Sequence, residues 1–76
     1  MDKSKIVVDI VASTVLIDSD KLDLNADLID QYGLDSLHIV ELTMKVEEEL
    51  KITVPDNVME KFRTTQQIID YIHTHH

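Results

Sequence analysis

Apolar residues recur at helical spacing along this chain, and residues that favour a helix start stand in front of each recurrence. The spacing predicts a first helix over about Lys3–Val15, with Asp2 able to cap its start. A second helix is expected to start at Asp35 or Ser36, which are both good capping residues, and to continue to about Leu50. The recurring positions of the first helix are Ile6, Val7, Ile10, Val11 and Thr14.

Two further helices are expected towards the end of the chain. Pro55 opens a short one, because proline is favoured in the first turn of a helix. Thr64 and Gln67 have the spacing of a capping box at the start of the last helix. The apolar faces of these two helices consist of Val58, Met59 and Phe62 in the short one, and Ile68, Ile69, Tyr71 and Ile72 in the last.

The segment between the first two helices, from Ile17 to Asp35, is rich in aspartate and predicts a long loop. Its apolar residues indicate a loop held on the core, and they are Leu22, Leu24, Leu28, Ile29 and Tyr32. A loop of this length in a compact domain is usually functional. We therefore predict a single all-α domain over residues 1–76, a small four-helix bundle with three longer helices, one short helix and a long first loop.

The net charge of the chain limits the classes of partner that it is expected to bind. Fifteen acidic and seven basic residues give a formal net charge of -8. Such a surface disfavours nucleic acid and anionic membranes and favours basic protein surfaces, unless the charge serves only solubility. The chain has no cysteine, which excludes a disulfide, a thiolate metal site and a cysteine nucleophile. No apolar run is long enough for a membrane span or a signal peptide, so we expect a cytoplasmic protein without stable membrane insertion. We also expect a monomer.

Candidate chemistry centres on the residues that precede the second helix. Gly33 permits a sharp turn, and Ser36 then carries a hydroxyl at a helix N-terminus. Free N–H groups and the helix dipole favour an anion there, so a phosphodiester on Ser36 Oγ would be stabilised. A serine at a helix start is nevertheless most often only a cap. The position alone therefore assigns no function.

The segment Gly33-Leu34-Asp35-Ser36-Leu37 resembles the phosphopantetheine attachment motif of the acyl carrier protein family, in its discrete bacterial form. The similar positions further along the chain are Val40-Glu41-Leu42, Met44, Glu47-Glu48-Glu49-Leu50, Ile52, Val54-Pro55-Asp56, Thr64-Thr65 and Ile69-Asp70-Tyr71-Ile72. The resemblance covers essentially the whole chain without an obvious insertion. Its length and spacing are far more specific than the Asp-Ser-Leu tripeptide alone.

The resemblance implies a carrier rather than an enzyme. A phosphopantetheinyl transferase would move 4′-phosphopantetheine from coenzyme A to Ser36, with Asp35 and Leu37 beside the attachment point. The thiol of this arm would hold acyl groups as thioesters, because the cofactor supplies the chemistry and the protein supplies positioning. The expected partners are that transferase and the acyl-transfer, condensing and tailoring enzymes of fatty-acid, specialised lipid or polyketide biosynthesis.

The second helix carries two apolar rows. The row expected to face the core consists of Ile39, Leu42, Val46 and Leu50. The other row consists of Leu37, Val40 and Met44, and it is flanked by Glu41, Glu47 and Glu48. Apolar contacts ringed by carboxylates suit a docking face for a basic partner. The alternative is that this row only widens the core stripe.

Several positions depart from the pattern of carriers in primary fatty-acid synthesis. They are His38 in place of an acidic residue, Ile39 in a threonine-like position, Lys45 in place of a small residue, and Lys51, Asn57 and Val58, which lower the acidity after Glu49. These departures fit a carrier for a dedicated pathway and ordinary lineage drift equally well.

Other functions are compatible with parts of the same sequence. A peptidyl or aminoacyl carrier would share the serine, and an acidic helical adaptor without a prosthetic group would use Ser36 only as a cap. A calcium loop at Asp18, Asp20 and Asp23 would lack the glycine and the closing glutamate of an EF-hand. No metal site is expected, since His73, His75 and His76 lie at the chain end and should form a solvated tail.

Overall fold

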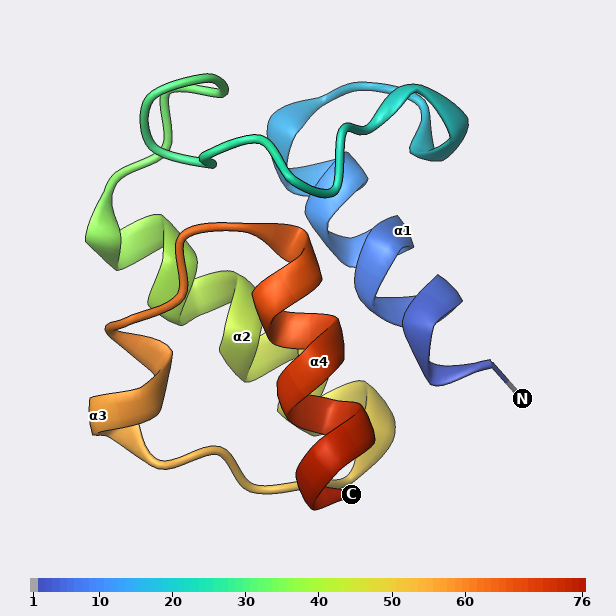
Figure 1. Ribbon diagram of the computed structural model, residues 1–76, viewed down its shortest axis with the longest axis vertical. Helices are drawn as coiled ribbons and strands as arrows, with labels where there is room; N and C mark the ends of the chain where they lie inside the picture. Colours follow the sequence, from blue (N-terminus) through green and yellow to red (C-terminus); the bar gives the residue numbers. More distant parts are fainter. Residues whose placement is uncertain (1) are drawn as a thin grey trace.

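The computed structural model describes residues 2–76, and every regular element in that range is helical (Figure 1). The elements are α1 (Lys3–Val15), the short 3₁₀-helix η1 (Ser19–Lys21), α2 (Ser36–Leu50), α3 (Asp56–Met59) and α4 (Thr65–His75). α1 packs against both α2 and α4, while α3 packs against α2. The predicted small helical bundle with one short helix is therefore confirmed. No helix among the described residues is both long and apolar enough to cross a bilayer.

α1 forms as its sequence pattern predicts. The Oδ1 atom of Asp2 accepts a hydrogen bond from the Ser4 N–H at 2.9 Å, which caps the first turn. Val7 and Val11, one helical turn apart, are fully buried. The helix ends at Leu16, whose φ of 63° lies in the left-handed region and whose side chain is 88% exposed. A left-handed residue closes a helix, but leucine bears a steric cost there that glycine would not.

α2 divides its side chains between the core and the surface. Ile39, Leu42 and Val46 are buried, as expected for the core row, and Leu50 packs against the core at the end of the helix. The helix ends at Lys51, which is also left-handed, with a φ of 57°.

The long loop between α1 and α2 is held on the core, as predicted from its apolar residues. Leu22 and Leu28 are buried, and Tyr32 packs partly against the core while its hydroxyl accepts a hydrogen bond from the Asp23 N–H at 3.0 Å. Figure 1 shows the loop crossing one end of the bundle, above the start of α4. The sequence reading missed η1, because a single 3₁₀ turn is too short to create a period of apolar residues.

The last two helices start where the sequence places them. Pro55 precedes α3, and Met59 at the end of this helix and Phe62 shortly after it are buried. Thr64 and Gln67 form the predicted capping box: the Gln67 N–H donates to Thr64 Oγ1 at 3.1 Å, and the Thr64 N–H donates to Gln67 Oε1 at 3.2 Å. The start of α4 is therefore fixed by its own first turn.

His73, His75 and His76 are exposed, as expected of a solvated chain end, but they lie in or directly after a regular helix and not in a frayed tail. α4 continues to His75, whose ring lies 4.3 Å from the ring of Tyr71, centroid to centroid. His73 Nε2 lies 2.9 Å from Ser4 Oγ, and the Lys3 ammonium donates to the His76 carbonyl at 2.8 Å. These contacts between α1 and the end of α4 hold the last turn in place.

Candidate functional site

In the chain, a single hydrogen-bonded turn of the long loop precedes the candidate site at the start of α2. Asp27 starts this turn, because its Oδ1 accepts from the N–H groups of Ile29 at 2.8 Å and Asp30 at 3.0 Å. Gly33 ends it with a φ of 71°, and the Gly33 N–H donates to the Ile29 carbonyl at 3.1 Å. Glycine suits this position because the left-handed conformation costs it no steric strain.

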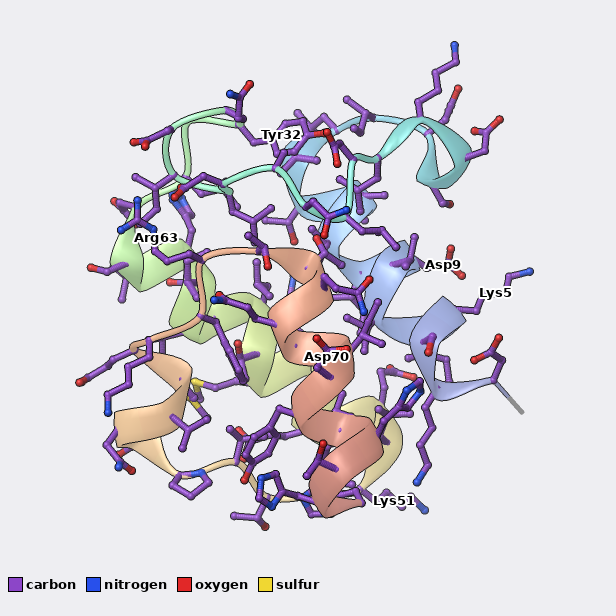
Figure 2. All side chains as sticks on the ribbon, in the orientation of Figure 1. Lys5, Asp9, Tyr32, Lys51, Arg63 and Asp70 are labelled. Atoms are coloured by element: carbon purple, nitrogen blue, oxygen red, sulfur yellow. The ribbon has the colours of Figure 1, made fainter. Side chains whose placement is uncertain are left out.

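Arg63, which lies between α3 and α4, binds the carboxylate of Asp27 at the start of this turn. Its Nη2 lies 2.7 Å from Asp27 Oδ2 and its Nε lies 3.3 Å from Asp27 Oδ1, a two-point contact. The Asp30 N–H, followed by the Arg63 guanidinium and the Ile29 N–H, holds the pKa of Asp27 below its usual range. In Figure 2 the Arg63 side chain lies beside the loop. The turn is thus tied to the segment between α3 and α4 across 36 residues of sequence.

The start of α2 is capped by Asp35 and not by Ser36. Asp35 Oδ1 accepts from the His38 N–H at 2.9 Å, and the Asp35 N–H points to His38 Nδ1 at 3.3 Å. The two residues form a reciprocal capping box, in which the imidazole takes the place that glutamate or glutamine usually has. The unusual His38 therefore has a local structural role.

Ser36 is left as a free hydroxyl at the first position of α2. The residue is exposed, and its Oγ makes no hydrogen bond to another residue in the range 2–76. The N–H groups of Ser36 and Leu37 also have no protein acceptor within that range. An accessible nucleophilic oxygen thus stands beside free donors at the positive end of a helix.

The candidate docking residues of α2 fall into two groups. Leu37 and Met44 are 63% and 55% exposed, and Glu41 and Glu48 are exposed beside them. Val40 is half-buried against the core, so it belongs partly to the core stripe.

Glu47 differs from the other two carboxylates, because its Oε2 accepts from the Val54 N–H at 2.8 Å. This bond ties α2 to the segment that leads into α3. Sequence reasoning missed it, as it missed the contact between Arg63 and Asp27, because neither pair has a sequence signature. The position of His38 three residues after a capping aspartate was a signal for the capping box.

Among residues 2–76, no three histidine, aspartate or glutamate side chains gather closely enough to hold a metal ion.

The sequence is similar to known proteins over most of its length. Residues 5–72 match the family described as "Phosphopantetheine attachment site". A protein named "Acyl carrier protein" from Clostridium perfringens is 39% identical over 67 residues, which cover 88% of each chain. Proteins of the same name from Bdellovibrio bacteriovorus and Syntrophobacter fumaroxidans are 42% and 38% identical over 66 residues, which cover 87% of this chain and 85% and 82% of theirs.

Proposed function

This chain belongs to the phosphopantetheine-attachment family of acyl carrier proteins, and we propose that it carries acyl groups on an arm joined to Ser36. The cofactor of this family is covalent 4′-phosphopantetheine, as the sequence resemblance implied. The observation that carries the assignment of Ser36 is its free hydroxyl. Because Asp35 supplies the cap, the serine is not occupied in the role that explains most serines at helix starts.

The residues around Ser36 fit a phosphodiester. Attachment joins Ser36 Oγ to the phosphorus that bears the pantetheine in coenzyme A, breaks the bond from that phosphorus to the adenosine bisphosphate, and releases the hydroxyl proton to the transferase. The free N–H groups of Ser36 and Leu37 and the helix dipole favour the resulting anion. Asp35 keeps the helix start in place. When bound, the arm supplies a thiol that holds an acyl group as a thioester.

The outer face of α2 is proposed as the docking face. Leu37 and Met44 offer apolar contact area, and Glu41 and Glu48 attract a basic partner. Leu37 and Met44 lie two turns apart on α2, so they share one face of the helix, and exposed apolar side chains on one face favour contact with a partner. Glu47 contributes charge, but its carboxylate is already bound to the Val54 N–H.

We further propose that the acyl chain is shielded between the helices. Each methylene removed from water contributes about 0.8 kcal/mol, and the core consists mostly of valine, isoleucine and leucine. A chain of medium length therefore gains more from the bundle than from solvent. This carrier role is non-catalytic, and the enzymes that load and process the chain supply the catalysis.

Intact mass after incubation with coenzyme A and a promiscuous transferase tests the attachment. The wild-type protein should gain one phosphopantetheinyl group, and Ser36→Ala should gain none while keeping its fold, since Ser36 Oγ makes no bond in the described structure. Ser13→Ala, a change at an exposed serine of α1, is the matched control and should be modified like wild type. A mass gain in Ser36→Ala would refute the assignment. A wild-type protein that gains nothing would favour the adaptor alternative.

A further inference from the structure

One buried polar side chain makes no hydrogen bond to the described residues. Thr65, the first residue of α4, is 0% exposed, and its Oγ1 has no hydrogen-bond partner among residues 2–76. Buried polar groups are nearly always paired, so an unpaired buried hydroxyl calls for an explanation. No other buried side-chain nitrogen or oxygen in the described range lacks a partner.

A second buried threonine shows why Thr65 is unpaired. Thr43 is also 0% exposed, but it lies inside α2, where its Oγ1 donates to the Ile39 carbonyl one turn earlier at 2.8 Å. Thr65 has no such acceptor, because the residue four positions earlier precedes the helix. Thr64 already occupies the capping role. The unpaired hydroxyl therefore follows from the position of Thr65 at the helix start.

Thr65 lies at the same end of the bundle as the attachment serine. The loop that leads to Ser36 is bonded to the chain on both sides of Thr65. The Leu28 N–H donates to the Arg63 carbonyl at 2.7 Å, and the Gln66 N–H donates to the Leu24 carbonyl at 2.9 Å. Figure 1 shows the start of α4 below this loop, at the end where α2 begins. Thr65 is thus held at the end of the bundle where the attachment serine lies, within reach of a chain carried on an arm at Ser36.

We propose that Thr65 Oγ1 recognises an oxygen substituent on the acyl chain, of the kind that a 3-hydroxyacyl or 3-oxoacyl group carries. This inference rests on the proposed carrier function and on shielding of the chain. An oxygen that enters an apolar core loses its hydrogen bonds to water. The hydroxyl of Thr65 both donates and accepts, so it satisfies either substituent and gains a partner itself. A plain alkyl chain leaves the Thr65 hydroxyl unpaired. The site would therefore favour oxygenated chains.

The test compares two arms on three proteins. Octanoyl and 3-hydroxyoctanoyl arms are loaded onto wild type, Thr65→Val and Thr43→Val with the transferase and the matching coenzyme A thioesters, and mass confirms the loading. In wild type and Thr43→Val, the melting temperature with the 3-hydroxy chain should exceed that with octanoyl by about 5 °C, the effect of one added hydrogen bond in a domain of this size. In Thr65→Val the difference should vanish or reverse, and Thr65→Ser should restore it.

The outcomes separate this inference from the function on which it rests. If Thr65→Val shows the same difference between the two chains as wild type, Thr65 does not recognise the oxygen, although the carrier function stands. Equal melting temperatures for apo and both loaded forms would mean that the chain stays in solvent, which also overturns the inference. Failure to load any arm on Ser36 would refute the proposed function itself.

Discussion

Replacing Thr65 by valine should stabilise the unloaded protein. The change replaces a buried hydroxyl that makes no hydrogen bond by a methyl group. Valine has nearly the shape of threonine, so the buried space at the start of α4 stays filled. An unpaired buried hydroxyl costs about 1–3 kcal/mol, and the methyl group that replaces it incurs no such cost. The two residues have similar helix propensity, so the backbone term is small. The expected gain in the free energy of unfolding is therefore about 1–3 kcal/mol.

Thr43→Val is the matched control, because it makes the same chemical change at an equally buried position. There the hydroxyl donates to the Ile39 carbonyl at 2.8 Å, and such a bond contributes about 0.5–1.5 kcal/mol. Burial of the new methyl group offsets part of that loss. Thr43→Val should therefore be neutral or less stable than wild type. The sign of the effect should differ between the two threonines.

Urea denaturation and thermal melting, both followed by circular dichroism, measure both variants. At about 4–8 °C per kcal/mol for a domain of this size, Thr65→Val should melt at least about 4 °C above wild type. The slope of unfolding free energy against urea should be unchanged, since the buried surface is the same. If Thr65→Val were no more stable than Thr43→Val, the hydroxyl of Thr65 would have a partner in solution. The reasoning from its unpaired state would then fail.

Three further predictions concern other parts of the molecule. Leu16→Gly should raise stability by about 0.5–1 kcal/mol, measured by thermal unfolding, because glycine removes the left-handed strain at φ 63°; a loss of stability would contradict this. Asp27 has a lowered pKa in the folded state, so its charge stabilises the fold above its usual pKa of 3.8, and this contribution is lost as pH falls through the folded value. Unfolding curves of wild type and Asp27→Asn should therefore converge at low pH, and a gap that is constant with pH would exclude the effect. Glu41→Lys should slow modification by the transferase at low salt, whereas Asp70→Lys on α4, with the same change of charge, should not. Met44→Ala should weaken docking without changing its salt dependence, and equal salt effects in all three variants would remove the outer face of α2 from the docking site.

The bounds of the longer helices could be predicted because local signals agree there. The observed ranges Lys3–Val15 and Ser36–Leu50 match the expected ones, since apolar periodicity and capping aspartates mark the same boundaries. The choice between Asp35 and Ser36 as the cap could not be made from sequence, because both residues are good caps. That choice depends on side-chain geometry at one turn, and it decides whether the serine hydroxyl is free.

Contacts between distant segments were not predictable from local patterns. The two-point contact of Arg63 with Asp27 depends on how the loop lies over the start of α4. The bond between Glu47 and the Val54 N–H likewise removes one carboxylate from a row that sequence spacing treats as uniform. Helical spacing gives the direction in which a side chain points, but it does not give the segment that the side chain meets.

The division of α2 into an exposed and a buried face allows the proposed docking and the proposed acyl shielding to be tested with separate mutations. Leu37 and Met44 lie outside the core, so shortening them opens no cavity and should leave the melting temperature nearly unchanged. Ile39 and Thr43 lie inside, so changes there alter the folded state without touching a docked partner. A double mutant that combines one change from each set measures whether the two faces are coupled. If the proposed docking face and acyl-chain shielding hold, a carrier of this kind can vary its docking face and its acyl-chain preference at different residues, and the proposed role of Thr65 belongs to the second.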